Sequence, residues 1–203
     1  MRRRSIRRRD PGRLAPSPDA DAMIKPTKPF PALTMMSPMV DISVRLEPET
    51  PADSEAIERL NERVFGPGRF ARTAYRLREE AAHDLGLSFV ARVGTLLVGA
   101  NRMTPVVIGQ TRALLLGPLI VEPVFRSRGI GEALVARSLE AAREAGGTIA
   151  ILVGDEPYYG RMGFKPTPPG RVRMPGPVDP ARVLYCEIAP GAFEGVGGAV
   201  TAG

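Results

Sequence analysis

The chain has 203 residues, of which 43% are hydrophobic and 25% are charged, values that allow one folded domain with a sizeable core. The net charge of +6 belongs to residues 1–40, because residues 41–203 hold 19 cationic and 19 acidic side chains. A neutral folded part argues against nucleic-acid binding. A single cysteine and a single histidine exclude an internal disulfide and argue against a metal site.

Residues 1–40 are rich in Arg and Pro and lack a periodic apolar pattern, so we expect a disordered basic tail. Three interpretations of this tail stay open: a solvated segment, a tether to an anionic surface, or a start of translation further downstream. No apolar run reaches the roughly 18–20 residues that span a membrane, and none follows the N-terminal arginines as in a signal peptide. We therefore expect a cytoplasmic protein without a membrane partner.

The folded part begins with an alternating segment, residues 42–47, which predicts a strand. Thr50, Pro51 and Asp53 then predict a helix start, because they supply a cap, a first-turn proline and the acidic member of a capping box. Apolar residues at helical spacing mark the buried face of this helix: Ile57, Leu60 and Val64. Gly66 and its neighbours end it.

A second helix is expected over residues 73–85, with His83 on its solvated face; a role in proton relay is the alternative for this histidine. Two strands follow, 88–93 and 96–108, and a short glycine-containing turn between them indicates a hairpin. The next strand, 112–121, is apolar throughout, as in a strand that is buried on both faces.

Gly117-Pro118 interrupts this apolar strand, and because proline cannot donate to a strand ladder we expect a bulge or a splay there. The clearest helix spans residues 129–145, and it is followed by a buried strand at 149–153 and a last strand at 182–188. We expect residues 191–203 to be frayed. This order predicts one α/β domain with a mixed sheet between residues 41 and 190.

The loop that joins the apolar strand to the long helix, residues 121–131, has the features of an anion site. The first turn of a helix carries unpaired N–H groups and partial positive charge. Gly129 and Gly131 let an anion approach the backbone closely, and Arg126 and Arg128 add full charges. The loop lacks the Gly-Lys-Ser/Thr of a Walker motif and the third glycine of a dinucleotide fingerprint. It is therefore either a pyrophosphate cradle of another type or a tight turn with solvated arginines.

Two motifs carry a resemblance to a known family. The pattern Arg-x-x-Gly-x-Gly after Val-x-Pro, within residues 121–131, resembles motif A of the GNAT superfamily of N-acetyltransferases. Residues 159–164, YGRMGF, resemble its motif B, Tyr-x-x-x-Gly-Phe. One helix and one strand separate the motifs, as in that fold, and the resemblance covers residues 42–188. It implies the GNAT-like acyl-CoA N-acyltransferase fold, an α/β fold whose mixed central sheet splays between two parallel strands and is flanked by helices.

The resemblance also implies acetyl-CoA as co-substrate, without a metal. The pantetheine arm would lie between the strands 115–121 and 149–153 and pair with backbone groups of the former. The loop amides would hold the pyrophosphate. The cofactor-binding residues implied are Leu119, Ile120, Val121, Arg126, Arg128, Gly129, Ile130 and Gly131.

The implied reaction is direct attack of an amine on the thioester, which needs a polarised carbonyl and a proton for the leaving thiolate. A backbone N–H near Val121 would polarise the carbonyl, and Tyr159 occupies the place of the family's proton donor. Tyr159 is either this acid or a packing residue, and Tyr158 is its neighbour.

No general base can be assigned, because strand 112–121 holds no carboxylate. Glu122, Asp155 and Glu156 lie near the predicted cleft, but each is as readily a surface carboxylate, and a water relay leaves no trace in a sequence.

We expect the acceptor, an amine of a small molecule or a protein, near the loop 65–72, where Arg69 and Arg72 either face an acidic substrate or are solvated. Nucleic acid is not an expected partner, and a homodimer is left open. The alternative function is a module of the same fold that senses acyl-CoA without turning it over.

Overall fold

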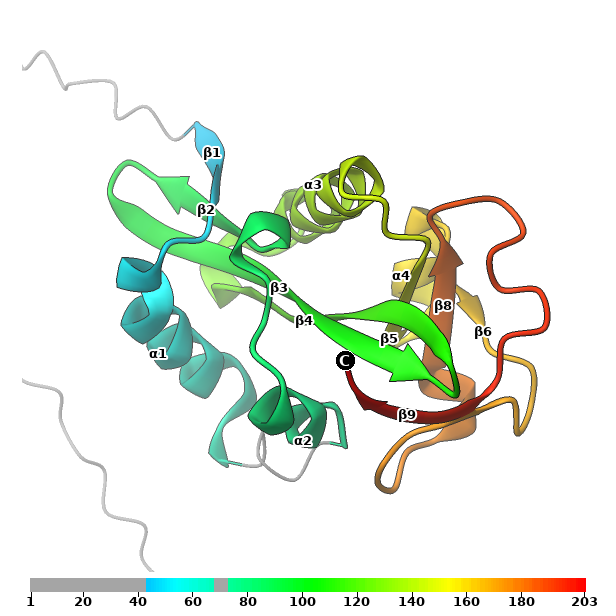
Figure 1. Cartoon of the computed structure of the whole chain (residues 1–203). Helices are drawn as coiled ribbons and strands as arrows, with labels where there is room; N and C mark the ends of the chain where they lie inside the picture. Colours follow the sequence, from blue (N-terminus) through cyan, green and yellow to red (C-terminus); the bar gives the residue numbers. More distant parts are fainter. Residues whose placement is uncertain (1–42, 68–72) are drawn as a thin grey trace, which may run out of the picture. The chain divides into compact units, whose positions relative to one another are not determined.

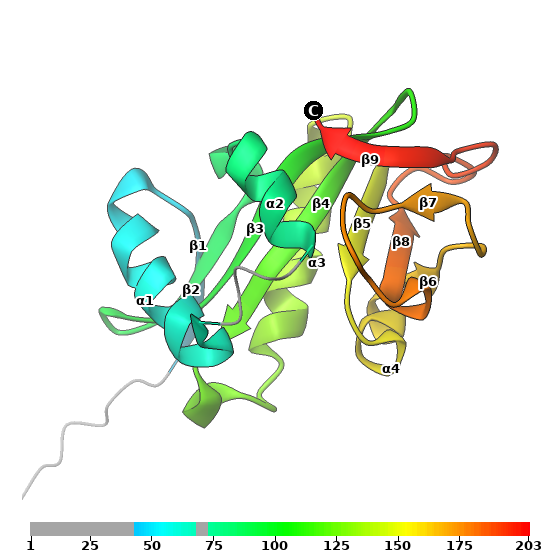
Figure 2. The ribbon, with the colours of Figure 1, turned by 90° about the horizontal axis from the view of Figure 1, so that it is seen from below.

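A computed structural model of the chain describes residues 43–67 and 73–203 (Figure 1). The predicted tail at residues 1–40 lies outside the described residues, as do Arg69 and Arg72 of the proposed acceptor loop. In the described part, a mixed sheet runs through the middle, with helix α3 on one face and helices α1 and α2 on the other (Figure 2). This is the predicted α/β architecture.

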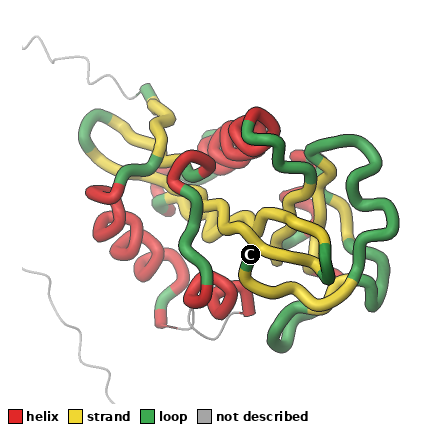
Figure 3. Tube along the Cα trace, viewed as in Figure 1, coloured by secondary structure: helices red, strands yellow, loops and turns green. Residues whose placement is uncertain are grey.

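The sheet follows the order β1-β2-β3-β4-β5-β8-β6, and β9 pairs with β3 and with β7. Figure 3 shows the strands in yellow and the helices in red. Only β4–β5 and β7–β9 are parallel among the pairs of the described residues. The strands are β1 (Val44–Pro48), β2 (Phe89–Val93), β3 (Leu96–Ile108), β4 (Thr111–Val121), β5 (Ile149–Val153), β6 (Lys165–Pro166), β7 (Val172–Arg173), β8 (Val183–Glu187) and β9 (Gly198–Ala202). The helices are α1 (Ser54–Phe65), α2 (Thr73–Glu80), α3 (Ile130–Glu144) and α4 (Glu156–Tyr159).

The start of α1 forms as its local sequence predicts. Asp53 Oδ2 accepts from the backbone N of Thr50 at 3.0 Å and from the Thr50 hydroxyl at 2.8 Å, as in a capping box. The turn Pro51–Asp53 is a 3-10 turn that leads into the helix. Ile57 and Leu60 are fully buried beneath it, which confirms the predicted apolar face.

Strand β4 carries the core on both faces, as its strongly apolar sequence predicts. Leu114 and Leu116 join the cluster beneath α3, whereas Leu115 joins the cluster that includes Leu77 of α2. Further along β4, Ile120 packs with α1. Because side chains alternate between the two faces of a strand, both faces must be covered, and the helices on either side cover them.

The predicted irregularity at Gly117-Pro118 is present. The peptide bond between the two residues is cis, and the β3–β4 register shifts between Asn101 and Met103, opposite this dipeptide. On its other edge, β4 pairs with β5 only through Leu114 and Leu115. Beyond these residues the two parallel strands diverge, so β4 presents an unpaired edge toward β5.

Two sequence-based expectations are wrong. The second helix ends at Glu80 rather than at residue 85, because the backbone N of Asp84 bonds to the carbonyl of Met103 at 2.8 Å and ties the following segment to β3. The C-terminal residues 191–203 are not frayed: they form β9, which extends the edge of β3. Phe193, Val196 and Val200 from this segment are buried, and this burial anchors it.

No helix among the described residues is both long and apolar enough to cross a membrane.

Candidate functional site

A cavity of about 1150 Å³ opens where β4 and β5 diverge. The second half of β4, the end of β5, the first turn of α3 and the α4 region enclose it, and residues of α1 and α2 close its other side. The loop between β4 and α3 contributes Arg126, Ser127 and Gly129 to the lining. The structure therefore brings the predicted anion loop to a cavity that is large enough for an extended ligand.

The N–H groups of this loop are available to a ligand. Among the described residues, none accepts a hydrogen bond from the backbone N of residues 127–132, and the first N–H paired within α3 is that of Ala133, with the carbonyl of Gly129 at 2.9 Å. Gly129 caps the helix in the left-handed region, at φ 77°. Because helix N-termini carry orphan donors and partial positive charge, this turn has the geometry that favours an anion.

Gly131 fits the loop because it has no side chain. A Cβ atom built on it would overlap the hydroxyl of Tyr158, which reaches across from α4. The Tyr158 hydroxyl therefore lies against the first turn of α3, beside the free amides. Burial raises the pKa of Tyr158, and the nearby Glu132 carboxylate adds to this rise. The phenol consequently remains a hydrogen-bond donor at neutral pH.

Next to this turn, the backbone N–H and C=O groups of successive β4 residues point alternately toward β3 and away from it. The N–H of Glu122 bonds to the carbonyl of Val98 at 2.8 Å, and Val121 lies opposite Gly99. In an antiparallel pair, this pattern turns the N–H and C=O groups of Val121 and Leu119 away from β3, toward the gap beside β5. These residues line the cavity, as expected for the groups that would pair with a pantetheine arm.

Ile120 differs from its two neighbours. It pairs with Ala100 of β3, and its side chain is buried against α1. It is not among the residues that line the cavity. Alternation along β4 therefore divides the predicted set: Leu119 and Val121 face the cavity, and Ile120 supports them from the opposite side.

The two arginines of the loop also differ from each other. Arg126 lines the cavity, and its Nε donates to the carbonyl of Val121 at 3.2 Å. This contact ties the loop to the end of β4. Arg128 does not line the cavity, and its guanidinium carbon lies 5.7 Å from the centroid of the Phe125 ring. Of the predicted cationic pair, Arg126 is the one placed at the site.

Tyr159 also lines this cavity. Its ring packs edge-on against Tyr158, with centroids 4.9 Å apart, and against Phe164 at 5.9 Å. It also covers Gly154, where a Cβ atom would overlap the ring. Burial raises the pKa of Tyr159 to about 12; the neighbouring Tyr158 and Asp155 reinforce the rise, and Arg78 and Arg182 oppose it. The phenol keeps its proton throughout the neutral range, as a proton donor must.

Comparisons with known proteins agree with this geometry. A family model described as "Acetyltransferase (GNAT) domain" matches residues 84–166. The protein called "Uncharacterized N-acetyltransferase YhbS" from Escherichia coli strain K12 is 28% identical over 154 residues, which cover 75% of this chain and 92% of that protein. The crystal structure of E. coli YhbS in complex with CoA superposes with a TM-score of 0.68 and 25% identity, over 80% of this chain and 91% of that one. The chain contains a GNAT acetyltransferase domain, matched at residues 84–166.

A second GNAT structure supports the same fold. The acetyltransferase from Brucella melitensis in complex with acetyl-CoA superposes with a TM-score of 0.60 and 26% identity, over 80% of this chain and 97% of that one. Both neighbours were crystallised with CoA or its acetyl ester. The β4–β5 divergence and the free amides at the start of α3 are the features of this GNAT chain that fit such a ligand.

Two of the three carboxylates that the sequence placed near the cleft form ion pairs, and one of these two, Asp155, lines the cavity. Glu122 forms an ion pair with Arg63 at 2.9 Å, and Asp155 forms one with Arg182 at 3.1 Å. Glu156 is not among the residues that line the cavity. None of the three is therefore held in the cavity as a free base.

Sequence reasoning missed the side chains that α1 and α2 contribute to this GNAT site. Asn61 and Arg78 line the cavity, and Arg78 lies beside Gly117 at the bend of β4. Asp179 and Arg182 enter from the segment before β8. No motif marks these residues, because long-range packing brings them together. The one sequence signal is that Asn61 follows Leu60 on α1, next to the buried face of the helix.

Proposed function

We propose that this chain transfers an acetyl group from acetyl-CoA to a primary amine of a small molecule or a protein, by direct attack within a ternary complex. The observation that carries the proposal is the row of unpaired amides at residues 127–132, which border a cavity that continues along the exposed edge of β4. A pyrophosphate on these amides would direct the pantetheine arm along Leu119 and Val121.

This chain's own groups divide the work of the reaction. When bound, acetyl-CoA supplies the activated acyl group. The outward N–H groups of Leu119 and Val121 are the donors that face the gap, so they orient the arm and polarise the thioester carbonyl. The Tyr159 hydroxyl, protonated because burial raises its pKa to about 12, donates to the departing thiolate.

The direct test is a titration of the full chain with acetyl-CoA by calorimetry, followed by measurement of free thiol released with a panel of amines. We expect saturable binding and amine-dependent thiol release. If no acyl-CoA binds at millimolar concentration, the proposal fails. Tight binding without turnover of any amine would instead identify an acyl-CoA sensor of the same fold.

A further inference from the structure

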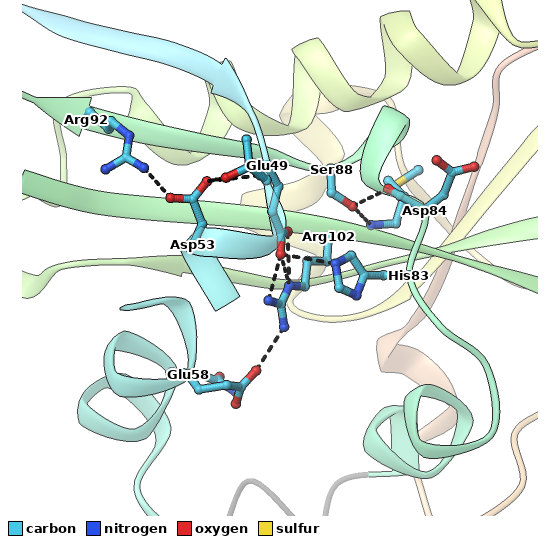
Figure 4. Close-up of polar contacts among 11 residues, drawn as sticks. Glu49, Asp53, Glu58, His83, Asp84, Ser88, Arg92 and Arg102 are labelled. Atoms are coloured by element: carbon cyan, nitrogen blue, oxygen red, sulfur yellow. Dashed lines mark hydrogen bonds and ion pairs between the residues drawn. The ribbon is translucent and has the colours of Figure 1, made fainter. Parts of the chain in front are cut away.

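A second, smaller cavity of about 180 Å³ adjoins the main one. It lies among α1, the segment that follows α2, and the irregular part of β3 (Figure 4). The two cavities share Asn61, Arg78 and Pro118 as lining residues. Pro118 immediately precedes the part of β4 where the thioester is expected. The small cavity therefore starts beside the proposed reaction site and extends to His83 on its far wall.

Two buried polar atoms in the lining of the small cavity have no partner among the described residues: Asn61 Oδ1 and Thr104 Oγ1. The Asn61 side-chain nitrogen is within 3.5 Å of Glu58 Oε2, an arrangement that leaves its oxygen as an acceptor. Thr104 is fully buried, and Asn61 is 5% exposed. Because a water molecule takes about 30 Å³ and needs two to four polar partners, a polar cavity of this size is suited to hold a short water chain.

His83 is held by a partly buried network of charged side chains (Figure 4). Its Nε2 is 3.1 Å from Oε1 of Glu49, a carboxylate whose side chain is 1% exposed. Arg102 fixes that carboxylate through its Nε at 3.0 Å and its Nη2 at 2.7 Å, and its Nη1 reaches Glu58 at 2.9 Å. A carboxylate only accepts hydrogen bonds, so Nε2 of His83 donates to Glu49, and in the neutral imidazole the lone pair is then on Nδ1. This arrangement, an imidazole oriented by a buried carboxylate, is that of a general base.

We propose that His83 accepts the proton of the attacking amine, through water held in the small cavity between Asn61 and Thr104. The inference rests on the proposed function. The amine nitrogen forms a bond to the thioester carbonyl carbon, and the C–S bond breaks. One amine proton passes through the water to His83 Nδ1, and the CoA thiolate takes the Tyr159 proton. The products are the acetylated amine and CoA thiol, after which His83 returns its proton through solvent and Tyr159 regains one.

Acidic groups outnumber basic groups around His83. Glu49 contacts the ring directly, and Glu58 and Glu79 line the same cavity. Arg102 and Arg78 line it as well, and Asp84, the next residue, accepts from the backbone N of Gly86. Arg102 is paired with both Glu49 and Glu58, so it holds the carboxylates without contacting the imidazole in the described hydrogen bonds. Among the groups named here, His83 carries the only imidazole.

The test compares the full-length wild type with His83→Gln, His83→Ala and the exposed control Glu80→Gln, which lies outside both cavities. Glutamine keeps a donor toward Glu49 but cannot accept the proton. With an amine that the wild type acetylates, we expect His83→Gln to lower kcat at pH 7 about 100-fold, within the range for general-base catalysis. The KM for acetyl-CoA should not change, and Glu80→Gln should match the wild type.

The pH profile separates catalysis from structure. The loss in His83→Gln should shrink as pH rises, because hydroxide then replaces the missing base, and imidazole in the buffer should restore at least tenfold activity to His83→Ala. Wild-type activity in His83→Gln, or a loss that is the same at every pH and is not rescued, would overturn the proposal. If His83→Ala does not fold, the pH profile of His83→Gln decides. If the wild type acetylates no amine, the proposed function fails first, and with it this role for His83.

Discussion

Replacing Tyr159 by Phe isolates the acid step of the proposed reaction. Phenylalanine keeps the edge-on contacts with Tyr158 and Phe164, whose ring centroids lie 4.9 and 5.9 Å from that of Tyr159, and it keeps the cover over Gly154. Only the hydroxyl is lost. The fold and the affinity for acetyl-CoA should therefore stay close to those of the wild type.

The size of the effect follows from the protonation state of this phenol. Because burial raises the pKa of Tyr159 to about 12, the hydroxyl is protonated at every pH at which the enzyme would be assayed. Loss of a positioned general acid costs about 10²–10⁴ in rate. We expect kcat to fall about 100-fold, which corresponds to about 2.7 kcal/mol of transition-state stabilisation.

The assay is steady-state thiol release with saturating amine, together with calorimetric binding of acetyl-CoA. Tyr158→Phe is the matched control, because its hydroxyl lies against Gly131 at the anion loop. That variant should change the affinity for acetyl-CoA more than kcat. A 100-fold loss of kcat in Tyr158→Phe, with Tyr159→Phe within threefold of the wild type, would refute the assignment of the acid.

Four further outcomes follow from the structure. Gly131→Ala should raise the Kd for acetyl-CoA about tenfold in calorimetry, because the new Cβ atom overlaps the Tyr158 hydroxyl, and adding Tyr158→Phe should restore most of the affinity; failure of that restoration would contradict the overlap. The pKa of Asp53 is lowered, since hydrogen bonds from Thr50 and the charge of Arg92 outweigh the opposing effect of burial. Asp53→Asn should therefore cost about 1–2 kcal/mol in urea unfolding at neutral pH and less as pH falls through the range where the wild-type carboxylate protonates; an equal cost at pH 7 and pH 3 would count against this. The pKa of Tyr159 is about 12 in the folded chain and about 10 in the unfolded chain, so the unfolded chain loses the proton first as pH rises. The free energy of unfolding should therefore fall by about 2–3 kcal/mol between pH 10 and about 12 in the wild type but not in Tyr159→Phe. Phe193→Ala should lower the free energy of unfolding by about 3–5 kcal/mol, because this buried ring stacks on Tyr185; a change below 1 kcal/mol would mean that the C-terminal segment does not stabilise the fold.

Local sequence chemistry accounts for much of the fold. The capping box at Thr50 and Asp53 forms because both partners lie within one turn. The strand bounds of β3 and β5 agree with the prediction because glycine turns and apolar runs mark them. The loop at residues 126–131 was predictable for the same reason, since a strand, two glycines and a helix start specify its position in any such fold.

The remaining features depend on contacts between residues far apart in the chain. β9 has a glycine- and alanine-rich sequence, and it becomes a strand because the free edge of β3 at Val106–Ile108 is available to it. His83 was expected on a helix face, yet it leaves the helix and meets Glu49, 34 positions earlier. Neither pairing leaves a periodic signal in the sequence. The sequence also could not show that Leu119 and Val121 face the cavity while Ile120 faces away, because this depends on the register between β3 and β4.

The most direct test of the central claim is the backbone amide spectrum of the ¹⁵N-labelled chain during titration with CoA. The account predicts large shifts that saturate together at residues 129–132, where the N–H groups are unpaired, with smaller changes at Leu119 and Val121. Saturable CoA binding that leaves the amides of residues 127–132 unmoved would contradict it.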